Sequence, residues 1–129
     1  MTDAQQATTS TDIGLRRSVT LQTIATLAEQ HNLPFPLDIG FSSTGRRLNL
    51  RLDDNDRAGV HAWAAVLGFP IEPEKAPHRS KTVGDGSPWV AVKAERIDYD
   101  KPVWLAWSWV SVWSAVNVPS RRKAKAVGA

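Results

Sequence analysis

The sequence LDIGFSSTGRRLNLRL, residues 37–52, decides the fold. Apolar and polar residues alternate on both sides of Thr44-Gly45, which is the period of a β-strand with one buried face. A tight turn at Thr44-Gly45 pairs Asp38 with Arg51, and this register places the apolar side chains of both halves on one face. The stretch therefore predicts an antiparallel hairpin.

A helix is expected before this hairpin, over about residues 18–31. Apolar residues recur there at three- and four-residue spacing, which forms one buried stripe. Ser18 or Thr20 can cap the start. The segment 32–34, Asn-Leu-Pro, can end the helix because asparagine adopts the left-handed conformation and proline blocks continuation.

A second helix is expected after the hairpin, over about residues 54–67, with Gly68 as its stop signal. The acidic run 53–56 can cap its first turn. The same run also suggests a calcium loop. Counting from the start of the run, however, Ala58 stands at the glycine position and Ala64 at the closing glutamate position, so we expect capping and no metal site.

A second hairpin is expected over residues 88–116. Alternation predicts a strand over 90–95, a turn over 98–101 and a return strand that begins at Pro102. A further strand over 80–83 is a weaker prediction. If residue 98 pairs with 101, one apolar set faces the helices, namely Val90, Val92, Ala94, Leu105, Trp107 and Trp109.

In the predicted register the other face of this second hairpin carries Lys93 and Glu95 together with apolar residues, namely Trp89, Trp104, Ala106 and Val110. A strand that is apolar on both faces is covered either by more of its own chain or by a partner. The N-terminal arm, the loop 70–87 or the tail could cover it, and this alternative stays open. If a partner protein or a second copy covers it, the candidate interface residues are Trp89, Trp104, Val110 and Val112.

The expected architecture is an α+β domain in the order α-β-β-α-(β)-β-β. Its antiparallel sheet has four or five strands and carries both helices on one face. Residues 1–15 are expected to be a flexible arm, 16–118 the single domain, and 119–129 a basic flexible tail.

The composition narrows the functional classes. The chain has 129 residues and no cysteine, so disulfides, thiolate metal sites and a cysteine nucleophile are excluded. No signal peptide or apolar span of membrane length is visible, which predicts a cytoplasmic protein that does not enter a membrane. Four of the sixteen lysines and arginines lie after residue 116 with none of the thirteen acids, so the body of the chain is close to neutral.

Nucleic-acid binding is the competing interpretation of the basic residues. Arginines on the first hairpin could contact phosphates together with the tail, and an exposed tryptophan could stack on bases. The candidates are Arg46, Arg47, Arg51, Arg79, Lys81, Arg121, Arg122, Lys123 and Lys125.

No catalytic or metal motif is found. His31, His61 and His78 do not have the spacing of metal ligands, and Gly84-Asp85-Gly86 lacks the third glycine and the lysine of a phosphate-binding loop. No serine lies in a G-x-S-x-G elbow. We therefore expect a protein that is not an enzyme and has no cofactor.

The stretch LQTIATLAEQHNLPFPLDIGFSSTGRRLNLRLDDNDRAGVHAWAAVLGF resembles the opening of uncharacterised small proteins from actinobacteria and their phages or mobile elements. The resemblance covers roughly residues 18–69 and implies an accessory protein of no known activity. The leading prediction is a non-enzymatic interaction module whose tryptophan-rich sheet contacts another protein or a second copy. The alternative is a nucleic-acid-binding accessory protein.

Overall fold

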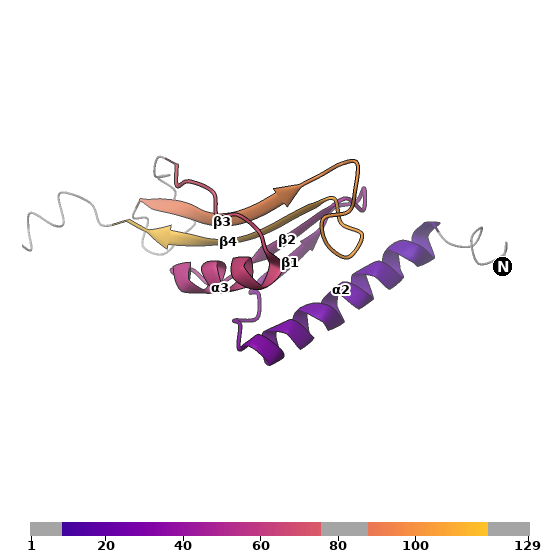
Figure 1. The fold of residues 1–129 in the computed structure, drawn as a ribbon, viewed down its shortest axis with the longest axis horizontal. Helices are drawn as coiled ribbons and strands as arrows, with labels where there is room; N and C mark the ends of the chain where they lie inside the picture. The colour runs from indigo at the N-terminus through magenta and orange to yellow at the C-terminus, as the bar shows by residue number, and fades with distance from the viewer. Residues whose placement is uncertain (1–8, 76–87, 119–129) are drawn as a thin grey trace, which may run out of the picture.

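The structure is a computed structural model that describes residues 9–75 and 88–118, with side chains from residue 13 onward. It confirms an α+β fold in the order α-β-β-α-β-β (Figure 1). The predicted extra strand over 80–83 and the tail 119–129 lie outside the described residues. The elements are α2 (Thr9–His31), β1 (Asp38–Phe41), β2 (Arg47–Arg51), α3 (Arg57–Leu67), β3 (Trp89–Ile97) and β4 (Trp109–Asn117).

The four strands form one mixed sheet in the order β1-β2-β4-β3. The pairs β1–β2 and β3–β4 are antiparallel, whereas β2 and β4 are parallel. The prediction of a wholly antiparallel sheet is therefore wrong. The reason is topological: the chain leaves β2, passes through α3 and β3, and returns in β4 along the direction of β2.

The first hairpin is confirmed with its predicted register. Asp38 lies opposite Arg51, and the Ser42 N–H donates to the Arg47 carbonyl at 2.9 Å. Gly45 has a φ of 71°, in the left-handed region that glycine enters without steric cost.

The predicted register of the second hairpin is wrong. Val90 lies opposite Val116 instead of Trp109, a shift of seven positions along β4. Because side chains alternate between faces, a shift by an odd number moves every β4 side chain to the opposite face from the predicted one.

The cause of this shift is a second turn inside the loop. The predicted turn at Asp98 exists, since its carboxylate accepts the backbone N–H groups of Asp100 and Lys101 at 2.9 and 3.2 Å. The chain then makes another tight turn, closed by a bridge between Trp104 and Trp107. The two residues between them have positive φ, 47° at Leu105 and 70° at Ala106, and β4 begins only at Trp109.

Helix α2 begins earlier than predicted, at Thr9, so residues 9–15 of the predicted arm are helical. Neither Ser18 nor Thr20 is its N-cap, because both lie inside the helix. The Thr20 hydroxyl donates to the Arg16 carbonyl one turn earlier, at 2.7 Å. The predicted end is confirmed: Asn32 has a φ of 54°, and the helix stops at His31.

Helix α3 begins at Arg57, three residues after the predicted start, because Asp56 is its N-cap. The Asp56 carboxylate accepts the Gly59 N–H at 2.9 Å. The predicted end is confirmed by Gly68, which has a left-handed φ of 74° and donates its N–H to the Ala64 carbonyl.

Both helices lie on the same side of the sheet (Figure 1). Between helices and sheet lies one core that contains Leu48 and Leu50 of β2, and Trp63 of α3. The indole N–H of Trp107 donates to the Thr20 hydroxyl at 2.9 Å and so ties the loop before β4 to α2. Within residues 9–75 and 88–118, no helix has the length and apolarity needed to cross a membrane.

Candidate functional site

The candidate site is the outer face, by which we mean the sheet face that points away from α2 and α3. Strand alternation defines its members, because most of their neighbours on β2, β3 and β4 are buried in the core. The face includes Asp38 and Gly40 of β1, Arg47, Asn49 and Arg51 of β2, Trp109, Ser111, Trp113 and Ala115 of β4, and Trp89, Ala91, Lys93, Glu95 and Ile97 of β3.

Two arginines of β2 lie over two tryptophans of β4. The parallel register pairs Arg47 with Trp109 and Arg51 with Trp113. The guanidinium carbons lie 4.2 Å and 5.1 Å from the respective ring centroids. A cation over an indole face is attracted by the electrons of the ring, so each arginine holds its tryptophan in place.

Further apolar side chains lie next to both arginine–tryptophan pairs, beyond Trp109 and beyond Trp113. At one end Ile97 pairs with Trp109, and Tyr99 meets the same ring edge-on at 6.5 Å. Ile97 and Tyr99 are 43% and 60% exposed. At the other end the rings of Trp89 and Trp113 lie 6.5 Å apart. The outer face is therefore aromatic along most of its length.

Glu95 anchors the middle of the outer face. Its carboxylate accepts the indole N–H of Trp109 at 2.6 Å and the hydroxyl of Ser111 at 2.7 Å, and its side chain is only 9% exposed. The Lys93 ammonium lies 3.6 Å from this carboxylate and 3.7 Å from that of Glu72. Glu72 belongs to the segment after α3, whose backbone bonds to the free edge of β3.

The two carboxyl groups have pKa values that are shifted in opposite directions. Burial, and then the hydrogen bond with Glu95, raise the pKa of Glu72 above its ordinary value of 4.5. Burial also acts to raise the pKa of Glu95. The hydrogen bonds from Ser111, Trp109 and Glu72 outweigh that effect, and the pKa of Glu95 is lowered.

We therefore expect stability to pass through a maximum at mildly acidic pH. As the pH falls towards 4.5, protonation of Glu72 in the folded state relieves an unfavourable charge, so the free energy of unfolding rises. Below 4.5 the stabilisation by ionised Glu95 is lost as the pH approaches its lowered pKa, so the free energy falls. Urea unfolding between pH 3 and 7 tests this. Glu72→Gln should remove the rise. Glu95→Gln should remove the fall and reduce the rise, because Glu95 helps to raise the pKa of Glu72. Profiles parallel to that of the natural chain would contradict the assignment.

A shallow hollow of about 280 Å³ opens on the outer face. Two cations, Arg47 and Lys93, and the amide of Asn49 provide its polar lining. Trp89, Ala91 and Trp113 provide its apolar lining, and none of the described lining residues carries a carboxylate.

Comparison with protein-family models, curated proteins and solved structures finds no match for this chain. The resemblance of residues 18–69 to small proteins of actinobacteria and their phages therefore stays a prediction. The function has to be argued from the outer face itself.

The predicted interface residues divide between core and surface. Trp89 lies on the outer face, as predicted. Val110 and Val112 are fully buried against the helices, so their assignment to an interface is wrong. Trp104 is half-buried in the turn before β4 and packs against the core. The physical reason in each case is the second turn, which shifts β4 by an odd number of residues.

The two tryptophans that were predicted to lie in the core, Trp107 and Trp109, lie on different sides of the sheet. Trp107 is fully buried, as predicted, whereas Trp109 lies on the outer face, so that prediction is wrong. The alternation along β3 places Lys93 and Glu95 on this face, as predicted. The sequence does not predict the contacts of Glu95 with β4 or the position of Trp113 on the same face, because only the register of β4 reveals them.

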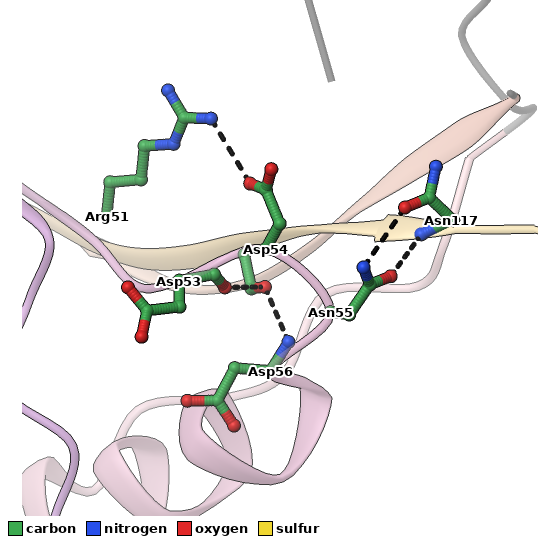
Figure 2. Close-up of polar contacts among 7 residues, drawn as sticks. Arg51, Asp53, Asp54, Asn55, Asp56 and Asn117 are labelled. Carbon is green, nitrogen blue, oxygen red and sulfur yellow. Dashed lines mark hydrogen bonds and ion pairs between the residues drawn. The ribbon is translucent and has the colours of Figure 1, made fainter. Parts of the chain in front are cut away.

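Of the predicted nucleic-acid residues, Arg47 and Arg51 lie on the outer face, and Arg46 is exposed in the β1–β2 turn. Arg51 lies opposite Asp38 as predicted, but its ion pair is with Asp54, at 3.3 Å (Figure 2). The remaining candidates lie outside the described residues, namely Arg79, Lys81, Arg121, Arg122, Lys123 and Lys125.

The acidic run before α3 attaches the helix start to β4 (Figure 2). The Ser114 hydroxyl donates to the Asp53 carbonyl at 2.7 Å and accepts the Asp56 N–H at 3.0 Å. Asn55 and Asn117 exchange two hydrogen bonds, of 3.1 and 2.8 Å. Among the described residues, no group of three acidic or histidine side chains could hold a metal ion.

Proposed function

We propose that this protein is a non-catalytic binding module that recognises another protein through the outer face. The observation that carries the proposal is the aromatic row on that face, where Arg47 and Arg51 lie over tryptophans beside the exposed Ile97 and Tyr99. Tryptophan, tyrosine and arginine are the residues most enriched at the energetic centres of protein interfaces.

The contacts within the outer face favour binding because they hold its side chains before a partner arrives. Trp109 is held by the Glu95 carboxylate at one edge and by Arg47 over its ring. Side chains that are already ordered lose less conformational entropy on association, and more of the contact energy remains as affinity.

The same geometry supports binding over covalent chemistry. Ser111, the hydroxyl that contacts Glu95, is fully buried, so a substrate has no access to it. Glu95 is occupied by two hydrogen bonds that fix neighbouring side chains. On the described part of the outer face, Glu95 and Ser111 therefore hold neighbouring side chains in place and are not available to react with a substrate.

Site-specific photo-cross-linking tests the proposal. A photo-reactive phenylalanine analogue at Tyr99, in the loop next to the outer face, is expected to capture a protein of defined mass in the cells that make this chain. The same analogue at His61, exposed on α3 on the helical side, is the matched control and should capture none. Trp113→Ala should weaken capture from position 99, because both residues belong to one surface.

Two outcomes would contradict the proposal. Adducts at position 99 that disappear on nuclease treatment would mean that the partner is a nucleic acid. If Trp109→Phe and Trp113→Phe each leave the acrylamide-quenchable part of the tryptophan fluorescence of the isolated monomer unchanged, other parts of the chain cover the face, which would leave no surface for a partner.

Single-stranded nucleic acid is the second candidate, because the structure brings Arg47 and Arg51 onto the same face as the tryptophans. Basic side chains interleaved with aromatic rings bind a phosphate backbone and its bases. Fluorescence anisotropy with a labelled single-stranded oligonucleotide separates the two candidates. Phosphate contacts weaken steeply as the salt concentration rises, whereas an aromatic protein interface does not.

A further inference from the structure

The Arg47 guanidinium is the charged group on the outer face whose N–H donors have no acceptor among the described residues. It lies 4.2 Å from the Trp109 ring centroid. Within the described residues its side chain makes no ion pair and no hydrogen bond, whereas Arg51 pairs with Asp54. The N–H donors of a guanidinium lie in its own plane, so a guanidinium held over a ring still offers them to an acceptor.

The hollow beside Arg47 has the chemistry of an anion site. Lys93 provides a second cation, Asn49 provides an amide, and Trp113 provides an apolar wall. None of the described residues that line the hollow carries a carboxylate, so on this lining a negative group meets two cations and no like charge.

We infer that the hollow between Arg47 and Lys93 binds an aspartate or glutamate side chain of the partner protein, next to an apolar residue that packs on Trp113. This inference rests on the proposed function and names the chemistry of the partner. A carboxylate can accept two parallel N–H donors of one guanidinium, which is the geometry that arginine offers best.

The charges behind the hollow favour a carboxylate over a phosphate. The Lys93 ammonium already lies within 3.7 Å of two carboxyl groups, those of Glu72 and Glu95. Its field is therefore partly neutralised, and the site suits a single negative charge better than the nearly double charge of a phosphate group.

A second copy of the chain fits the outer face poorly. The register places Arg51, Trp113 and Lys93 in one row across the sheet. If two outer faces packed about a twofold axis along β4, Arg51 of one copy would meet Lys93 of the other. Like charges that face each other disfavour such a dimer, and an acidic partner meets no such opposition.

Three capped peptides test the inference against the full chain: acetyl-Leu-Glu-Leu-amide, its glutamine twin, and its phosphoserine twin. Binding is followed through the NMR signals of the tryptophan indole N–H groups. We expect the glutamate peptide to shift the Trp109 and Trp113 signals and to bind about tenfold more tightly than the glutamine peptide, since a charge-assisted hydrogen bond is worth about that factor.

The variants locate the effect. Arg47→Gln should reduce the affinity for the glutamate peptide to that for the glutamine peptide, and Arg47→Lys should recover only part of it, because lysine keeps the charge without the paired donors. Arg46→Gln removes a neighbouring exposed cation and should leave the preference unchanged. Circular dichroism confirms that each variant is folded.

Three results would overturn the inference: equal affinity for the glutamate and glutamine peptides, an equal loss from Arg46→Gln and Arg47→Gln, or tighter binding of the phosphoserine peptide. Cross-linking from position 99 distinguishes these failures from failure of the proposed function. Capture that persists in Arg47→Gln would mean that the outer face binds a protein without a carboxylate in the hollow.

Discussion

Trp107→Ala is expected to lower the free energy of unfolding by about 3–5 kcal/mol, the usual cost of removing a large buried aromatic side chain. Trp107 is fully buried. Its ring lies 5.3 Å from that of Phe41 and beneath the Arg16 guanidinium at 4.7 Å, and its N–H bonds to Thr20. The substitution leaves a cavity where the loop before β4, the first hairpin and α2 meet.

Trp109→Ala is the matched control, two residues further along and on the opposite side of the sheet. It removes the hydrogen bond to Glu95 and the stacking with Arg47, with an expected cost of about 1–2 kcal/mol. Urea unfolding monitored by circular dichroism measures both variants. Equal losses would contradict the register of β4, which is what separates these two residues.

Ser114→Val is expected to lower the free energy of unfolding by about 2–4 kcal/mol, because it leaves two backbone groups without their partner. Ser114 is fully buried. Its hydroxyl donates a hydrogen bond to the Asp53 carbonyl and accepts one from the Asp56 N–H (Figure 2). Valine replaces the hydroxyl with a methyl group and adds a second one, so overpacking of the buried site adds to the loss, and the hydrogen-exchange readout below isolates the hydrogen bonds.

Amide hydrogen exchange gives this variant a local readout. The Asp56 N–H should exchange faster in Ser114→Val than the loss of global stability alone requires, because its acceptor is gone. Thr26→Ala is the control, since it removes an exposed hydroxyl that bonds only to the Gln22 carbonyl of the same helix, and it should change stability little. Unchanged stability in Ser114→Val would mean that the start of α3 does not depend on β4.

The first hairpin and the ends of both helices could be predicted because their causes are local. The register of the hairpin follows from one turn at Gly45 and from the alternation next to it. Asn32 and Gly68 stop the helices through their own left-handed conformations. In each case a few neighbouring residues contain the whole physical reason.

The second hairpin could not be predicted because two turns lie within one loop. The turn at Asp98 has a recognisable sequence, but the turn at Leu105 and Ala106 uses left-handed residues that are neither glycine nor asparagine. Propensity gives no reason to place it there. Missing it exchanged the two faces of β4 and assigned Val112 to the surface and Trp109 to the core.

The candidate site depends on a pairing that no short segment encodes. Arg47 and Trp109 meet only because β2 and β4 are parallel neighbours. The sequence therefore suggested two separate surfaces, arginines for nucleic acid and tryptophans for protein. The structure joins members of both sets, Arg47, Arg51 and Trp89, on one face.

The strand order has a consequence for synthesis on the ribosome. β4 is the last of the four strands to be translated, yet it occupies a central place in the sheet, between β2 and β3. Until it emerges, the edges of β2 and β3 that β4 pairs with are open, and open strand edges are prone to pair with other polypeptides. The native sheet therefore forms only after β4 has been synthesised and has inserted between β2 and β3.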